Sequence, residues 1–193
     1  YMAYPVTKSG NYVAIAVPFD IDEKPLAAQT IGFEFFKVGE ENPWKSLGYA
    51  VYVDDCILPL FGNNPMAYYV EVLENKDMPG LFRMVEPYGP EFPMYPYASS
   101  YATGSYIEID ATDPEGVWIE GWQSTGLDVQ NNGLMSITSM AWYQANKEGA
   151  TKEDVKEAGL CGIYADGVIT FPADGILTEL GGQAYYGNRN GAF

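Results

Sequence analysis

The sequence predicts a mostly β protein, an antiparallel β-barrel or β-sandwich with one short helix. Tyr, Gly and Pro are numerous, at 16, 21 and 13 of 193 residues, and this composition is typical of strands joined by turns. Short aromatic and β-branched runs alternate with turn-forming stretches, whereas long apolar helical segments are missing. Hydrophobic residues make up 47% of the chain, which suffices for a packed core.

Residues 1–38 read as a hairpin whose arms are Asn11–Val17 and Thr30–Val38. A lone hairpin is marginally stable in water, so these strands are expected to pair with others. They resemble the last two strands of an immunoglobulin-like sandwich, and we therefore predict an incomplete immunoglobulin-like domain over residues 1–38. Gly39–Pro43 marks the predicted boundary, and residues 39–193 form the predicted β-barrel or β-sandwich domain. The chain opens in what reads as the middle of a folded unit, so we expect that processing or truncation removed its beginning.

In the second domain, apolar and aromatic runs between turn signals predict the strands. These strands are Tyr49–Val53, Tyr68–Val72, Gly80–Val85, Tyr106–Asp110, Leu134–Tyr143 and a last one around Gln183–Tyr186. Two turns have the two-residue hairpin pattern. They are Asp54-Asp55, which precedes the apolar run Cys56–Phe61, and Asp166-Gly167, which separates Gly162–Ala165 from Val168–Phe171.

One helix is predicted, over residues 151–158. Thr151 and Asp154 resemble a capping box in which Asp takes the place of Glu or Gln. Gly159 supplies the stop signal at the other end. A helix of about two turns is too short to be stable alone, so tertiary contacts are expected to hold it.

The charge of the chain limits its partners. The chain has 26 acidic and 10 basic residues, which gives a formal net charge of −16. This balance repels phosphate backbones and anionic lipid, so no nucleic-acid partner is predicted. The sequence contains no apolar run of about 18 residues that would span a bilayer, and its start shows no signal-peptide pattern.

Histidine is absent from the sequence, and this removes the commonest general base, the Ser-His and Cys-His pairings and every His-ligated metal site. G-x-S-x-G, P-loop and G-x-G-x-x-G motifs are also absent, so no cofactor is predicted. Cys56 and Cys161 are compatible either with one disulfide in an oxidising compartment or with two buried free thiols. No metal-ligand spacing joins them.

Paired carboxylates are the remaining route to catalysis, because a glycosidase needs only two acidic side chains. The candidates are Asp54, Asp55, Asp110, Asp113, Glu115 and Asp166. Each lies in or beside a predicted turn, where Asp stabilises the backbone, so turn formation is the preferred interpretation. Neither Asp20–Glu23 nor Asp110–Glu115 matches the calcium-loop template, and no metal site is predicted.

Aromatic side chains are concentrated in one Pro-rich loop and its exit strand. The set comprises Tyr88, Phe92, Tyr95, Tyr97, Tyr101 and Tyr106, and Trp118 and Trp122 follow soon after. Aromatic faces beside Asp and Asn acceptors suit sugar rings, so a glycan platform is one interpretation. The other is that the loop packs over the end of the barrel or sandwich. For the glycan interpretation, the predicted platform residues are Tyr95, Tyr97, Tyr101, Trp118 and Trp122.

Four segments, taken together, resemble a known group of proteins. They are Trp44–Gly48 with the following Tyr52–Asp55, then Gly80–Tyr88, Tyr106–Pro114 and Asp166–Ala173. In this order they resemble the β-rich region of secreted surface lipoproteins from gut Bacteroidetes, many of uncharacterised function. The resemblance covers Pro43–Phe193 and implies an extracytoplasmic location at the cell surface or in the periplasm, anchored to the outer membrane by lipid. The chain lacks the lipidated N-terminal Cys, and the resemblance supplies no site residues.

Three functional hypotheses follow. The first is a non-enzymatic cell-surface binding module with a glycan as its leading ligand. The second is a structural or accessory subunit of an outer-membrane or adhesin assembly, in which an apolar aromatic surface contacts a protein complex. The third is a carboxylate-based glycosidase, which requires two acidic groups about 5–10 Å apart across a cleft.

Overall fold

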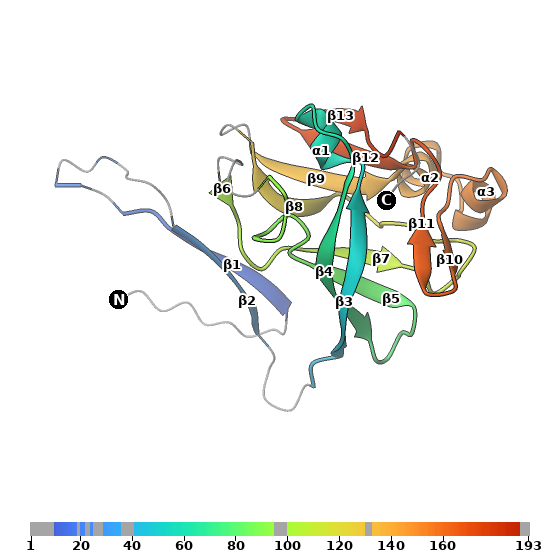
Figure 1. The fold of residues 1–193 in the computed structure, drawn as a ribbon, viewed down its shortest axis with the longest axis horizontal. Coiled ribbons are helices and arrows are strands. Elements are labelled where there is room, and N and C mark those ends of the chain that lie inside the picture. Colours follow the sequence, from blue (N-terminus) through green and yellow to red (C-terminus); the bar gives the residue numbers. More distant parts are fainter. Residues whose placement is uncertain are drawn as a thin grey trace.

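The computed structural model describes residues 10–18, 20, 21, 24, 29–35, 41–94, 100–129 and 133–189. Over these residues the protein is mostly β, with antiparallel sheets and short helices (Figure 1). The described strands form no closed barrel, so the predicted fold class is confirmed in its sandwich-like form.

The predicted N-terminal hairpin is confirmed. Strand β1 (Gly10–Ala16) pairs antiparallel with β2 (Gln29–Phe35), from Gly10 opposite Phe35 to Ala16 opposite Gln29. The two strands form a sheet of their own. The assignment of residues 1–38 to an immunoglobulin-like domain, and the domain boundary after them, stay predictions.

A four-stranded sheet, here called the front sheet, has the order β3-β4-β5-β7. Its strands are β3 (Trp44–Asp54), β4 (Met66–Asn75), β5 (Leu81–Val85) and β7 (Tyr106–Asp110). The period of two in β5 and β7 sends one set of side chains inward, so Phe82, Met84, Ile107 and Ile109 are buried. The intervening side chains lie on the outer face. There the Arg83 guanidinium lies 3.8 Å from the Trp44 ring and 3.9 Å from the Tyr106 ring.

A second sheet, the back sheet, has five strands in the order β13-β12-β9-β8-β6. They are β6 (Ser100–Tyr101), β8 (Gln123–Asp128), β9 (Leu134–Ser139), β12 (Ile176–Leu180) and β13 (Gln183–Tyr186). Leu127, Ile137 and Ile176 of this sheet are fully buried and belong to the same core cluster as Ile107 of the front sheet. The main hydrophobic core therefore lies between the two sheets.

The front sheet continues beyond β7 through isolated bridges. Asp110 pairs with Trp118, and Val117 pairs with Gly162, which directly precedes the hairpin of β10 (Ile163–Ala165) and β11 (Val168–Thr170). The result is a curved wall that begins at β3 and ends at β11. In Figure 1 the β10–β11 hairpin lies to the right of β3, with the arrows of β3 and β11 both pointing upward. We call this set of strands the front wall.

The predicted Asp54-Asp55 hairpin is wrong, because a helix follows these residues. Helix α1 (Ile57–Leu60) begins directly after Cys56. The Asp54 carboxylate accepts hydrogen bonds from the amides of Cys56, Ile57 and Leu58 at 3.2, 3.1 and 2.7 Å. Asp54 therefore satisfies the otherwise unpaired N–H groups of the first helical turn.

Helix α3 (Lys152–Glu157) confirms the predicted helix. Thr151 caps it, and both hydrogen bonds of the Thr151–Asp154 capping box are present. The structure adds a further helix, α2 (Met140–Glu148), where the sequence predicted that the strand from Leu134 continues to Tyr143. Ser139 caps α2 by accepting a hydrogen bond from the Trp142 amide, and this cap ends β9.

Both cysteines are free and buried, which decides between the two predicted states. Cys56 belongs to the main core, whereas Cys161 belongs to a small cluster beneath α2 and α3 with Ala141, Ala145 and Val155. Burial raises the pKa of both thiols, so both stay protonated at neutral pH.

Candidate functional site

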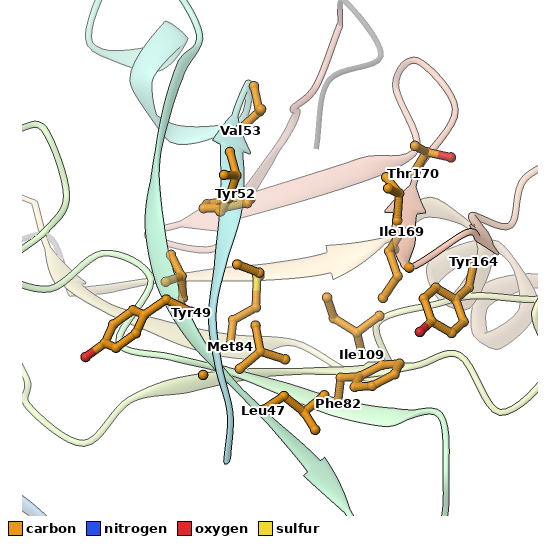
Figure 2. A pocket seen from close by; sticks show the side chains of 17 residues that line it. Leu47, Tyr49, Tyr52, Val53, Phe82, Met84, Ile109, Tyr164, Ile169 and Thr170 are labelled. Carbon is orange, nitrogen blue, oxygen red and sulfur yellow. The ribbon is translucent and has the colours of Figure 1, made fainter. Parts of the chain in front are cut away.

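An apolar groove of about 530 Å³ lies between the two ends of the front wall (Figure 2). Residues 47–53 of β3 form one side, and Tyr164 and residues 167–170 of the β10–β11 hairpin form the other. The floor consists of Val70, Val72, Phe82, Met84 and Ile109. Figure 2 shows Phe82, Met84 and Ile109 between the two sides, so side chains of the core line the bottom of the groove although they are largely buried.

The β3 side of the groove is exposed and apolar. Tyr49 and Val51 are 71% and 62% exposed, and Ala50 between them is also exposed. On the opposite side, Val168 is 58% exposed. Exposed apolar residues therefore occur along both sides of the groove, and exposed apolar surface of sufficient area marks sites of interaction.

The hairpin side is held in place by a turn and by ring packing. Asp166 and Gly167 have φ angles of 51° and 78°, and a two-residue turn with both φ values positive fits the right-handed twist of the flanking strands. The predicted Asp166-Gly167 hairpin is therefore confirmed. The Tyr164 and Phe82 rings meet edge to face with centroids 5.4 Å apart, which ties the hairpin to the floor.

A buried hydrogen-bond network closes the end of the groove at Tyr52. The Tyr52 and Tyr88 hydroxyls lie 2.8 Å apart, and the Tyr52 hydroxyl donates to Asp54 at 3.2 Å. Burial, together with the neighbouring Tyr88 and Asp54, raises the pKa of Tyr52 well above its usual value. The tyrosine is therefore neutral at physiological pH and brings no charge to the groove.

None of the described residues that line the groove is charged. Among the candidate carboxylates, Asp54 and Asp55 are buried outside the lining, and Asp166 lies in the hairpin turn. Lys152 and Lys156 donate to Asp110 and Asp113, each at 2.8 Å.

These ion pairs dock α3 onto the 110–116 turn. For Asp110, burial raises the pKa, but hydrogen bonds from Lys152 and Thr112 outweigh burial and hold the pKa below its usual value. The hydrogen bond from Lys156 likewise lowers the pKa of Asp113. Across the described ranges, no group of three Cys, Asp or Glu side chains is placed to hold a metal ion.

The structure describes three of the five predicted platform residues, Tyr101, Trp118 and Trp122. Tyr95 and Tyr97 lie outside the described residues. Tyr101 packs against the main core and its hydroxyl lies 2.6 Å from the Ser105 hydroxyl, whereas Trp118 packs against the α2–α3 cluster. Trp122 is 37% exposed.

The rest of the aromatic loop packs inward at the positions that the structure describes. Tyr88 and Phe92 are buried in the main core, and their rings meet edge to face with centroids 5.3 Å apart. This matches the interpretation that the loop covers the end of the sandwich. The platform of Tyr95, Tyr97, Tyr101, Trp118 and Trp122 stays a prediction.

Sequence reasoning missed the residues of the groove. Tyr49–Val53 is apolar on both faces, and such a run is typical of a strand buried in the middle of a sheet. The structure instead places β3 at the edge of the front sheet. The signal in the sequence was that apolar and polar residues do not alternate in this run. Such a run indicates either a strand buried on both faces or a strand that binds a partner.

Fold and site together define a mostly β, sandwich-like protein with an uncharged apolar groove at an open strand edge. Comparisons with protein-family models, with curated proteins and with solved structures find no match to the chain. None of the described helices has the length and apolar character needed to cross a membrane.

Proposed function

We propose that this protein is a non-enzymatic binding module and that the groove between β3 and β11 is its binding site. The observation that carries the proposal is a groove of about 530 Å³ whose lining is apolar and, among the described residues, uncharged. Each Å² of apolar surface removed from water contributes about 25 cal/mol, so an apolar ligand would be stabilised here by burial alone. The volume falls within the range of ligand pockets, roughly 300–1,000 Å³.

The lining favours an apolar ligand over a sugar. A sugar ring requires hydrogen-bond partners for its hydroxyl groups, and polar side chains are few in this groove. Tyr52, the tyrosine at the groove's end, already uses its hydroxyl in the buried network with Tyr88 and Asp54. This supports the function of an accessory subunit, whose apolar surface contacts another protein, over that of a glycan receptor.

Binding of the neutral dye Nile red tests this proposal. Wild-type protein is expected to bind the dye saturably with a rise in fluorescence. Ala50→Glu, which places a charge on the exposed side of the groove, is expected to weaken binding at least about tenfold, since an unpaired charge is costly in an apolar site. Met78→Glu makes the same charge change at an exposed methionine in the β4–β5 turn and serves as the matched control.

Two outcomes of the dye experiment would contradict the proposal. Either an absence of saturable binding, or an equal loss of binding in Ala50→Glu and Met78→Glu, would show that the groove is not the dye site. Far-ultraviolet circular dichroism of both variants confirms that the comparison is made between folded proteins.

A second candidate, glycan binding, is favoured by one surface feature. The exposed Trp122 ring meets the Tyr143 ring of α2 at a centroid distance of 6.2 Å, and the Lys147 ammonium lies 5.7 Å from the Tyr143 centroid. Such a pair offers an aromatic face and a hydrogen-bond donor. A glycan array followed by calorimetry tests it: a hit must be lost in Trp122→Ala and kept in Leu134→Ala, an exposed apolar residue of β9. An array without a hit would remove this candidate.

The cellular location remains part of the proposal. The resemblance to surface lipoproteins supports attachment to the outer membrane through lipid, outside the cytoplasm. Protease treatment of intact cells that carry the natural full-length protein is expected to digest it while a cytoplasmic marker survives. Survival of both proteins would contradict a surface location.

A further inference from the structure

Both strands that border the groove end a sheet. Within the described part of the chain, β3 pairs only with β4, and β11 pairs only with β10. Because alternate N–H and C=O groups of an edge strand point away from its neighbour, β3 has a row of backbone donors and acceptors available for a further strand. Figure 1 shows β3 and β11 running in the same direction, so a strand between them can be antiparallel to both.

The edge of β3 lacks the usual protection against pairing. Proteins commonly block such an edge with charged side chains, proline or a bulge. Lys45 and the bulge between Ser46 and Gly48 lie at one end of β3. From Gly48 to Val53 the strand has neither a charged residue nor a proline. The unprotected stretch is the same one that lines the groove.

We propose that the groove takes an extended segment of a partner polypeptide, which adds to β3 as an antiparallel strand. This inference rests on the proposed function and names the class of ligand. Main-chain hydrogen bonds to β3 would hold the segment, and its inward side chains would lie over Val70, Phe82, Met84 and Ile109. Because side chains alternate along a strand, the matching segment has apolar residues at every second position.

The negative charge of this protein indicates which residues flank the apolar segment of the partner. The protein has a net charge of −16, and one acidic residue lies directly beside the groove. The exposed Asp166 forms the hairpin turn next to the lining residue Gly167. Lysine or arginine at the ends of the segment complements this field.

The same charge argues against a second copy of this chain as the occupant. Pairing of β3 with β3 would bring together two molecules that each carry a net charge of −16. Their mutual repulsion opposes association at physiological ionic strength. The partner is therefore a different polypeptide with an apolar strand and basic flanks.

A backbone-modified peptide provides the test. The probe is a synthetic peptide of alternating valine and threonine, as long as β3 and flanked by lysines. Its matched control has the same side chains but carries methyl groups on its central amide nitrogens, which removes the backbone donors. We expect the unmethylated peptide to bind wild-type protein and Met78→Glu, and the methylated peptide to bind at least about tenfold more weakly. Calorimetry measures both.

The outcomes separate this inference from the proposed function. Equal binding of the two peptides, or Nile red binding without peptide binding, overturns strand addition while the groove remains a binding site. If neither Nile red nor the peptide binds, both the proposed function and strand addition are overturned. A dimer of the unliganded protein in analytical ultracentrifugation that Ala50→Glu abolishes and Met78→Glu keeps identifies a second copy as the occupant and overturns the inference. Because the methyl groups are on the peptide, the peptide comparison does not depend on the folding of any variant.

Discussion

Asp54 connects β3 to α1, and its replacement gives a stability change that follows from the structure. Asp54→Ala removes the acceptor for three backbone amides, those of Cys56, Ile57 and Leu58, at 3.2, 3.1 and 2.7 Å. All three residues are buried, at 1%, 0% and 0% exposure, so water does not readily replace the carboxylate. The substitution therefore leaves N–H groups of the first helical turn without a partner.

The expected cost of Asp54→Ala is about 3 kcal/mol. Loss of a helix-capping acceptor costs about 0.5–2 kcal/mol, and a buried donor without a partner costs about 1–3 kcal/mol. Burial raises the pKa of Asp54, which means that the ionised carboxylate carries a desolvation penalty that the substitution removes. The net loss is therefore smaller than three separate amide penalties. For a chain of this size it lowers Tm by roughly 6–12 °C.

Urea unfolding followed by circular dichroism measures this loss. The control is Asp77→Ala, which removes an exposed carboxylate from the β4–β5 turn. Substitutions of this kind usually change the free energy of unfolding by less than about 0.5 kcal/mol. If Asp54→Ala changes it as little as Asp77→Ala does, the carboxylate does not hold the turn and the reasoning is refuted.

Two further predictions concern packing and pH. Gly80 has a φ of +91°, and an added Cβ would lie 2.8 Å from the Ala111 carbonyl oxygen. Gly149 has a φ of +69°, and an added Cβ there would have no atom within 4 Å. Gly80→Ala should therefore lower the free energy of unfolding by at least about 1 kcal/mol more than Gly149→Ala does. Equal urea midpoints would contradict this. The folded state lowers the pKa of Asp110 below its value in the unfolded chain, which is about 3.9. The ionised Asp110 therefore stabilises the fold above about pH 3.9, and this stabilisation is lost as the pH falls through the pKa of the folded state. Lys152→Met should therefore reduce the urea midpoint at pH 7 by more than it does well below pH 4, and a difference independent of pH would count against the ion pair.

Local chemistry made some elements predictable from sequence. In Asp166-Gly167, glycine at the second position accepts a positive φ, and the β10–β11 hairpin forms as expected. The capping box of Thr151 and Asp154 likewise located α3, because its two hydrogen bonds are made within four residues. Both signals depend on neighbours in sequence and on little else.

Other elements were mispredicted because one pattern fits two structures. Asp54-Asp55 lacks the glycine of the other turn, and the Asp54 side chain instead pairs with the amides of α1. The run from Leu134 to Tyr143 is apolar enough to read as one strand, yet Ser139 accepts a hydrogen bond from the Trp142 amide and starts α2. In each case a side-chain hydrogen bond at a helix start decided the outcome.

The site could not be predicted because it depends on strand order. Tyr49–Val53 has the composition of a central strand, and only the pairing of β3 with a single neighbour places it at an edge. The groove between β3 and β11 also depends on contacts between residues distant in sequence, such as the bridge between Val117 and Gly162, which positions the β10–β11 hairpin. The density of aromatic residues in the Pro-rich loop suggested a binding surface, but Tyr88 and Phe92 of this loop pack into the core.

Residue-resolved amide hydrogen exchange by NMR is the measurement closest to the central claim. With the lysine-flanked valine–threonine peptide at saturation, alternate amides between Gly48 and Val53 should exchange at least about tenfold more slowly than in the free protein, because they gain hydrogen-bond partners. Unchanged exchange along β3 with the peptide bound, or protection confined to another surface, would show that the groove does not accept an added strand.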